Sequence, residues 1–285
     1  MSAIRIVTDS ACDLPPATAA QHNIDVVPLT IRIDGTEYVD RRDLTPQEFW
    51  AKSTASKTLP ETAAPSPGAF EECFRAAASA GASGVVCVTL SSELSATFQS
   101  AQLAADAVKD TIEVRVIDGR SVTIAQGLLA IAGAEAAAAG KSIDDVAAAI
   151  EQKIPRMRVF AALDTLENLK KGGRIGRAQA ALGSMLNIKP LIQLENGAVG
   201  EAGKQRTRSR SLDQLIELAK SHRAADAKPL AVMHGDAPDL DKFLDDLCSA
   251  LGRSRDEILL GDIGSVVGTH AGPRAIGVAY EELEA

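Results

Sequence analysis

One stretch decides the fold: Val85-Val-Cys-Val-Thr-Leu90, followed by the polar turn Ser91-Ser-Glu-Leu-Ser95. A continuous apolar run of this length that ends in a turn predicts a strand buried on both faces. The residues from about Leu94 to Val108 predict a helix. A strand, a turn and a helix in this order form the unit from which parallel sheets are built, so the stretch favours an α/β fold.

The same alternation of strand and helix continues on both sides of this stretch. The pattern predicts strands at 4–8, 26–33 and 114–117, and helices at 66–81, up to Gly140 and at 143–153. Three polar clusters each follow a strand: Thr8-Asp9-Ser10, Ser91-Ser92 and Asp118-Gly119. In a parallel sheet these clusters share one edge, where ligands bind. The first half of the chain therefore predicts a mostly parallel sheet with helices on both faces.

Pro155 marks the expected boundary between two domains, residues 1–154 and 155–285. Beyond it, strands predicted at 159–162, 190–194, 230–233, 258–260 and 275–280 alternate with helices, one of them starting at Ala178. This pattern indicates a second α/β domain. We also expect Val266-Val267 to end a strand, so that His270 would lie on a stiff turn between Gly268 and Pro273.

Composition limits the classes of function. Hydrophobic residues make up 46% of the 285 residues but aromatic ones only 3%, so we expect an aliphatic core. The net charge of -8 argues against nucleic acid as the main partner. The sequence shows neither a long uncharged apolar run nor a signal-peptide pattern, and its four cysteines are scattered. We expect a soluble, cytoplasmic protein with no transmembrane segment.

Several residues are candidates for binding an anion or for catalysis. The segment Lys170–Arg177 places four cations around three glycines, a composition that suits a phosphate or carboxylate, although a solvated loop explains it equally well. A second basic cluster spans Arg206–Arg210. Ser95 lies where a helix begins, and its hydroxyl could cap that helix or donate to an anion. Thr62 lies in an extended polar segment, and His234 follows a predicted strand.

Other kinds of site lack their sequence patterns. The four histidines are isolated, which argues against a metal site. The first strand is followed by Thr8-Asp-Ser-Ala-Cys-Asp13 and not by a dinucleotide-binding G-x-G-x-x-G. The sequence contains neither a phosphate-binding G-x-x-x-x-G-K-[ST] loop nor the G-x-S-x-G of a serine hydrolase.

Taken together and in order, the motifs resemble those of the DegV family of fatty-acid-binding proteins. They are Val7-Thr-Asp-Ser10 with Asp13-Leu14, Thr62–Pro67, Ser91–Ala101, Leu169–Gly176, Lys189-Pro190 and Gly268-Thr-His-Ala-Gly-Pro273. The resemblance covers nearly the whole chain. In some bacteria these proteins serve as the acyl-carrying subunit of fatty acid kinase.

The resemblance implies a long-chain fatty acid buried between the two domains, and no cofactor or catalytic residue in this chain. It implies that Thr62, Ser95 and His270 hold the carboxylate, while Arg174 and Arg206 face the phosphate and a kinase partner. That partner would be an ATP-binding subunit similar to dihydroxyacetone kinases, and its product would enter phospholipid metabolism. The sequence departs from the usual family pattern at Ala63, Ala64, Ala96 and Arg274.

Two alternatives remain at this point. The protein could bind or transport lipid without a kinase partner. It could also be an independent hydrolase that uses Ser95 and His270. The sequence gives neither the length of the fatty acid nor the oligomeric state.

Overall fold

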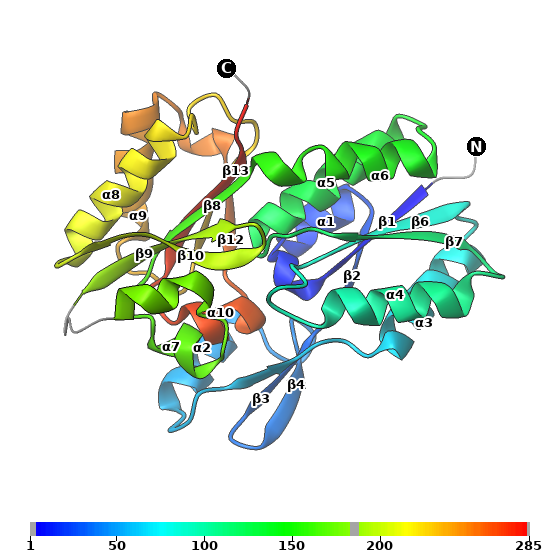
Figure 1. The fold of residues 1–285 in the computed structure, drawn as a ribbon, viewed down its shortest axis with the longest axis horizontal. Coiled ribbons are helices and arrows are strands. Elements are labelled where there is room, and N and C mark those ends of the chain that lie inside the picture. Colours follow the sequence, from blue (N-terminus) through cyan, green and yellow to red (C-terminus); the bar gives the residue numbers. More distant parts are fainter. Residues whose placement is uncertain (1–3, 183–187, 284–285) are drawn as a thin grey trace.

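The computed structural model describes residues 4–182 and 188–283, which form two large sheets with their helices and one small sheet (Figure 1). The first sheet has four parallel strands in the order β2-β1-β6-β7, which confirms the parallel sheet expected around Val85–Leu90. The strands are β1 (Ile4–Asp9), β2 (Ile24–Val27), β6 (Gly84–Thr89) and β7 (Glu113–Asp118).

Helices cover both faces of the parallel sheet, because alternate side chains of its central strands enter two different cores. Val86 and Val88 pack on the side of α5 and α6, whereas Val85 and Cys87 pack on the side of α3 and α4. Figure 1 shows the two helix pairs on opposite sides of the sheet. The helices of this half are α1 (Pro16–Gln21), α3 (Pro67–Ser79), α4 (Thr97–Val108), α5 (Ile124–Ala138) and α6 (Ile143–Glu151).

The second large sheet has six strands in the order β10-β9-β8-β13-β11-β12. Its neighbours run antiparallel except β11 and β12, which are parallel. The strand over 198–205 was not expected from the sequence. The strands are β8 (Met157–Ala162), β9 (Lys189–Glu195), β10 (Ala198–Gln205), β11 (Leu230–His234), β12 (Ile258–Asp262) and β13 (Ile276–Glu281).

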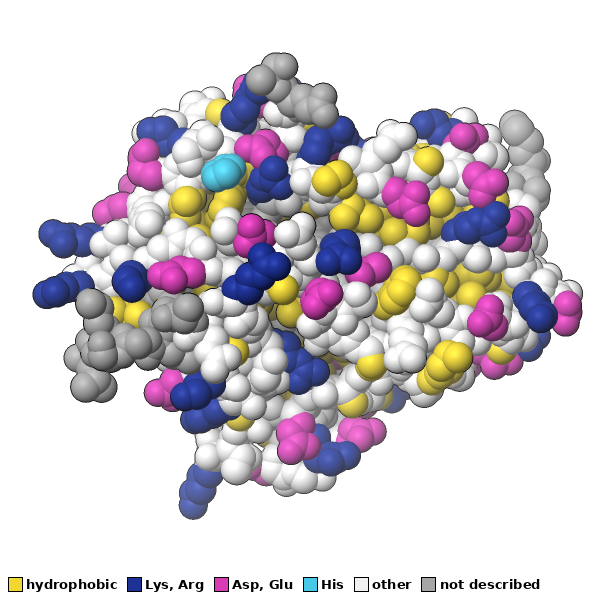
Figure 2. Space-filling view, viewed as in Figure 1, with side chains coloured by type: hydrophobic (Ala, Val, Ile, Leu, Met, Phe, Trp, Pro, Cys, Tyr) yellow, Lys and Arg dark blue, Asp and Glu magenta, His cyan; other side chains and the backbone are white. Residues whose placement is uncertain are grey.

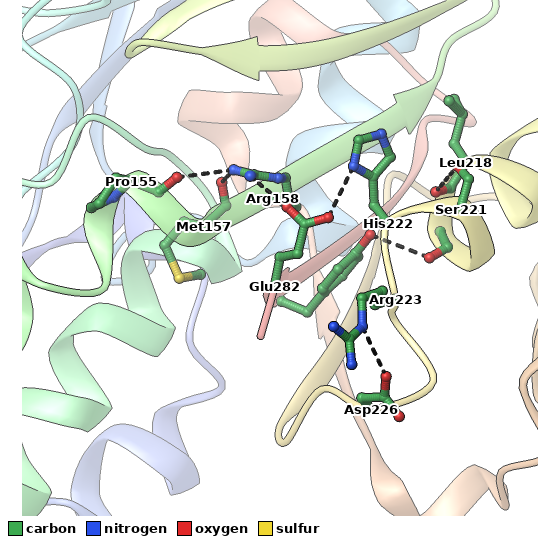
Figure 3. Close-up of polar contacts among 11 residues, drawn as sticks. Pro155, Met157, Arg158, Leu218, Ser221, His222, Arg223, Asp226 and Glu282 are labelled. Atoms are coloured by element: carbon green, nitrogen blue, oxygen red, sulfur yellow. Dashed lines mark hydrogen bonds and ion pairs between the residues drawn. The ribbon is translucent and has the colours of Figure 1, made fainter. Parts of the chain in front are cut away.

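The two faces of the six-stranded sheet have different partners. Helices α8 (Arg208–Ser221) and α9 (Leu240–Leu251) cover one face, where Tyr280 and Phe243 are fully buried. At this end of β13, Glu282 lies 3.1 Å from His222 Nδ1 and pairs with Arg158 (Figure 3). The opposite face turns toward α5, and one hydrophobic cluster joins Ile6 of the first sheet to Met233 of the second.

A small antiparallel sheet, in the order β4-β3-β5, corrects the single strand expected over 26–33. The chain leaves β2 at Val27 and enters β3 at Thr30, since Pro28 between them has no N–H for a strand ladder. The strands are β3 (Thr30–Ile33), β4 (Thr36–Val39) and β5 (Glu61–Ala63), and α2 (Pro46–Ala55) follows β4. A capping box of Thr45 and Glu48 opens α2.

Val266 and Val267 do not end a strand, so that expectation was wrong. They belong to α10 (Ser265–Ala271), a short helix that packs against Phe49 and Trp50 through Gly268. A short apolar run does not distinguish a strand from a helix, and here the tertiary contacts of α10 decide. Helix α7 (Glu167–Lys171) is also short. The helix expected from Ala178 is a 3₁₀ segment over Gly176–Leu182, and its continuation lies outside the described residues.

The surface and the remaining short segments complete the description. Three more 3₁₀ turns cover Ser10–Cys12, Ile154–Arg156 and Arg255–Glu257. Acidic and basic side chains are intermixed on the face shown in Figure 2. Across the described ranges, none of the helices is both long and apolar enough to cross a membrane.

Candidate functional site

A cavity of about 950 Å³, counting the space open to solvent, lies between the carboxyl edge of the parallel sheet and the six-stranded sheet. Apolar side chains from both sheets dominate its lining, among them Leu29, Leu90, Leu94, Val159, Leu163 and Met233. The polar residues of the lining are Thr62, Ser95, Thr123, Arg174, Gln193 and His270.

His270 projects from α10 and meets Thr62 of β5, with 3.0 Å between Nε2 and the Thr62 hydroxyl oxygen. On its other side the imidazole packs closely against Gly172. A Cβ at Gly172 would lie only 2.3 Å from His270 Nδ1, so this position requires a glycine. The small sheet and the loop after α7 therefore fix the orientation of the imidazole.

Burial makes His270 an uncharged group at neutral pH. Desolvation, with a further contribution from the charge of Arg174, lowers the pKa of His270 to about 4. A neutral imidazole has one donor and one acceptor nitrogen. Within the part of the chain that the structure describes, Nδ1 has no hydrogen-bond partner. This unpaired nitrogen is buried on the side of Gly172, so Nε2, beside the Thr62 hydroxyl, is the ring nitrogen with a polar partner.

Arg174 and Ser95 complete this end of the cavity. The Arg174 guanidinium donates from Nε to the carbonyl of Leu94 at 3.0 Å and from Nη1 to the carbonyl of Gly172 at 2.6 Å. It therefore ties the turn that carries Ser95 to the loop that packs against His270. The Ser95 hydroxyl lies 2.8 Å from that of Thr97, at the start of α4. A continuous chain of contacts thus gathers two hydroxyls, an imidazole and a guanidinium.

The expected second basic cluster does not join this end of the cavity. Arg206 is exposed directly after β10 and is absent from the described lining of the cavity. Arg208 pairs with Asp239 at 2.9 Å, so its charge is balanced within the protein. His234 lies at the end of β11, 3.3 Å from an oxygen of Asp262, and lies outside that lining as well.

The polar clusters after β1, β6 and β7 do meet at one edge of the sheet, as expected. The Ser92 hydroxyl donates to Asp118 at 2.5 Å, and the backbone N–H of Leu90 donates to Asp9 at 2.8 Å. These contacts shape the edge and fix the turn that leads to Ser95. Among the departures from the family pattern, Ala63 and Ala64 line the cavity itself.

The sequence analysis missed a buried polar network that holds the first residues of α10. Asp13 accepts from the Gly264 N–H and from Arg41 Nη2, both at 2.9 Å. The Ser265 hydroxyl donates to Asp40. Burial raises the pKa of Asp13 to about 6. The only signal in the sequence was the polar turn after the first strand, and Asp40 and Arg41 belong to no motif.

The comparisons with known proteins identify the family of this chain. Residues 3–283 match the model of the DegV family, which is described as uncharacterised. This chain belongs to the DegV family. A DegV domain-containing protein of Streptomyces coelicolor is 34% identical over 275 residues, which span 96% of this chain and 97% of the relative.

Solved structures of DegV proteins share the fold almost over their full length. A DegV family protein from Thermus thermophilus, described by its fatty acid binding, aligns with a TM-score of 0.88 and 30% identity, covering 99% of this chain and all of that one. A stearic-acid-binding protein from Eubacterium ventriosum aligns with a TM-score of 0.90 and 29% identity over 98% of both chains. The α/β architecture of two large sheets is therefore the DegV fold.

Proposed function

We propose that this protein binds a long-chain fatty acid in the cavity and presents its carboxylate to a separate kinase subunit. One observation carries the proposal. Thr62, Ser95 and His270 come from three distant parts of the sequence, all three line one mostly apolar cavity, and Thr62 contacts His270. A ligand with one anionic head group and a long apolar tail matches this combination of a few polar side chains and a mostly apolar lining.

The energetics of such a site are favourable at both ends of the ligand. Each methylene buried in the aliphatic lining contributes about 0.8 kcal/mol. A buried carboxylate must be hydrogen-bonded, and two hydroxyls and an imidazole N–H can supply donors. Arg174 stands beside them with its positive charge. Fatty acid binding by the DegV relatives from Thermus thermophilus and Eubacterium ventriosum supports the same assignment.

In the kinase step, the partner subunit and not this chain would bind the ATP. A carboxylate oxygen attacks the γ-phosphorus, the bond from that phosphorus to the ADP oxygen breaks, and an acyl phosphate and ADP result. Arg174 lies beside the head group and would stabilise the new phosphate, while the exposed Arg206 would contact the kinase. The resemblance to acyl-carrying subunits of fatty acid kinase supports this role, and a dihydroxyacetone-kinase-like subunit would hold the ATP. The acyl phosphate would supply phospholipid synthesis.

Mass spectrometry of lipid extracted from the purified protein tests the binding function. We expect about one long-chain fatty acid per protein, and much less in a Thr62→Val, His270→Ala double variant. Lipid-free wild-type protein that also fails to take up added fatty acid would overturn the proposal.

Phosphorylation by a cognate kinase tests the second part. We expect Arg206→Ala to keep its fatty acid but to lose most acyl phosphate formation. Arg223→Ala, just beyond the other end of α8, is the control because it also removes an arginine whose side chain is partly exposed. If no such kinase acts on the loaded wild-type protein, the protein is instead a stand-alone lipid-binding or transport protein.

A further inference from the structure

A row of residues crosses the six-stranded sheet on the face toward the cavity. In the strand register, Ala161 of β8 lies opposite Ile192 of β9 and Gly277 of β13, and Gly277 lies opposite Met233 of β11. Side chains that share a register position point to the same face of a sheet. Ile192, Ala161 and Met233 line the cavity, so this face is the one that a ligand would touch.

Met233 fills the space that a side chain at Gly277 would occupy. A Cβ at Gly277 would lie 3.1 Å from both the sulfur and the terminal methyl carbon of Met233. The thioether of Met233 therefore lies across β13 in the direction of Ala161. Methionine has three rotatable side-chain bonds and adapts to irregular gaps, whereas its neighbours in the row are branched or small.

The row lies at a definite depth in the cavity. On β8 and just beyond it, the residues that line the cavity are Val159, Ala161 and Leu163. Leu163 lies toward α7, whose following loop packs against His270. With a rise of about 3.3 Å per strand residue, Ala161 lies roughly 7 Å deeper than Leu163, and Val159 roughly 7 Å deeper again. A tail that extends inward from the carboxylate must pass Leu163 before it reaches the row.

We propose that Met233, laid across Gly277 and facing Ala161, sets the length of acyl chain that the cavity accepts. This inference rests on the proposed fatty acid binding. The small residues at 161 and 277 keep the space open, and the thioether narrows the cavity between Leu163 and the deeper part lined by Val159. Each further methylene that the cavity can bury strengthens binding about fourfold, so a change in this constriction moves the preferred length.

The test compares the affinities of delipidated variants for myristic, palmitic, stearic and arachidic acids. We expect Met233→Ala to move the tightest-bound acid to the next longer member of this series, because three heavy atoms leave the constriction and open the way to the part lined by Val159. Ala161→Leu should move it to a shorter member. Gly277→Ala should do the same, because its new Cβ would press the thioether into the cavity.

Met157→Ala is the matched control. Met157 is a buried methionine at the start of β8, outside the described lining of the cavity, and its loss should leave the preferred acid unchanged. A folded Met233→Ala protein that ranks the four acids as the wild type does would overturn the proposed role of Met233 in setting the chain length, while leaving fatty acid binding in place. Failure of the wild type to bind any of the four acids would overturn the proposed function, and with it the proposed role of Met233.

Discussion

The imidazole of His270 is held without charge beside Thr62, in the position where a carboxylate would need a donor. Replacing His270 by alanine should weaken fatty acid binding, because the buried anion loses one partner. The expected loss is about 1–3 kcal/mol, roughly fivefold to a hundredfold in affinity. Calorimetric titration with palmitic acid measures it. His22→Ala, which removes a histidine at the end of α1, should bind as the wild type does. Equal affinities in all three proteins would contradict the assignment.

Binding of the negatively charged ligand should change the pKa of His270. Burial and Arg174 lower the pKa of His270 to about 4 in the empty cavity. A carboxylate within hydrogen-bond distance favours the protonated ring, so loading with fatty acid should raise this pKa. Nitrogen chemical shifts of the imidazole, followed against pH with and without ligand, measure the change. A pKa that stays constant or falls on loading would place the carboxylate elsewhere.

At the scale of elements, α10 is held at both ends by parts of the small-sheet unit. Thr62 of β5 meets His270 at the end of α10, and Asp40, directly after β4, accepts from Ser265 at its start. Ser265→Ala should lower the free energy of unfolding by about 1–3 kcal/mol, because the buried Asp40 carboxylate loses its donor. Urea denaturation measures the loss. Ser221→Ala, an exposed serine on α8, should change the same quantity by less than about 0.5 kcal/mol. Similar effects for both serines would show that the contact to Asp40 does not hold α10.

The same elements show how far sequence reasoning reaches. Strand β6 was predictable because its signal is local: it is one run of apolar residues whose side chains pack into two cores. α10 was not, since Val266 and Val267 suit a strand or a helix equally, and the choice depends on contacts with Phe49 and Trp50. Thr62 and His270 are 208 positions apart, so no local pattern pairs them. Only the family resemblance did so, and its motifs included Asp13 but neither Asp40 nor Arg41 of the buried network.

Across the whole molecule, buried titratable groups give stability a pH dependence of both signs. Burial raises the pKa values of Asp9 and Asp13 to about 6, so between about pH 4 and 6 the folded chain binds more protons there than the unfolded chain. These carboxylates therefore make the protein less stable as the pH rises through that window. His270 acts oppositely, because its folded pKa of about 4 lies below the unfolded value near 6.5.

The contribution of His270 can be isolated by comparison with His270→Gln. As the pH falls from 7 to 4, the unfolded wild-type chain gains a proton at His270 that the folded chain does not take up, and the wild type loses stability. The glutamine variant has no titratable group at this position and does not lose this stability. Relative to the wild type it should gain up to about 3 kcal/mol over that range, which urea denaturation at several pH values measures. A difference in the free energy of unfolding that stays constant over this pH range would mean that burial does not lower the pKa of His270.

The last prediction concerns how the two halves unfold. A single hydrophobic cluster joins Ile6 and Val86 of the parallel sheet to Met233 of the six-stranded sheet, and the cavity lies between the same layers. Because a fatty acid in this cavity would contact both halves, binding should stabilise the molecule as one unit. At a free fatty acid concentration of about one hundred times Kd the gain is roughly 2.7 kcal/mol. Calorimetry of delipidated and loaded protein should show one transition that moves to higher temperature as a whole. Two transitions, only one of which moves, would mean that the tail contacts a single half, and the fatty acid would then have to lie outside the cavity described above.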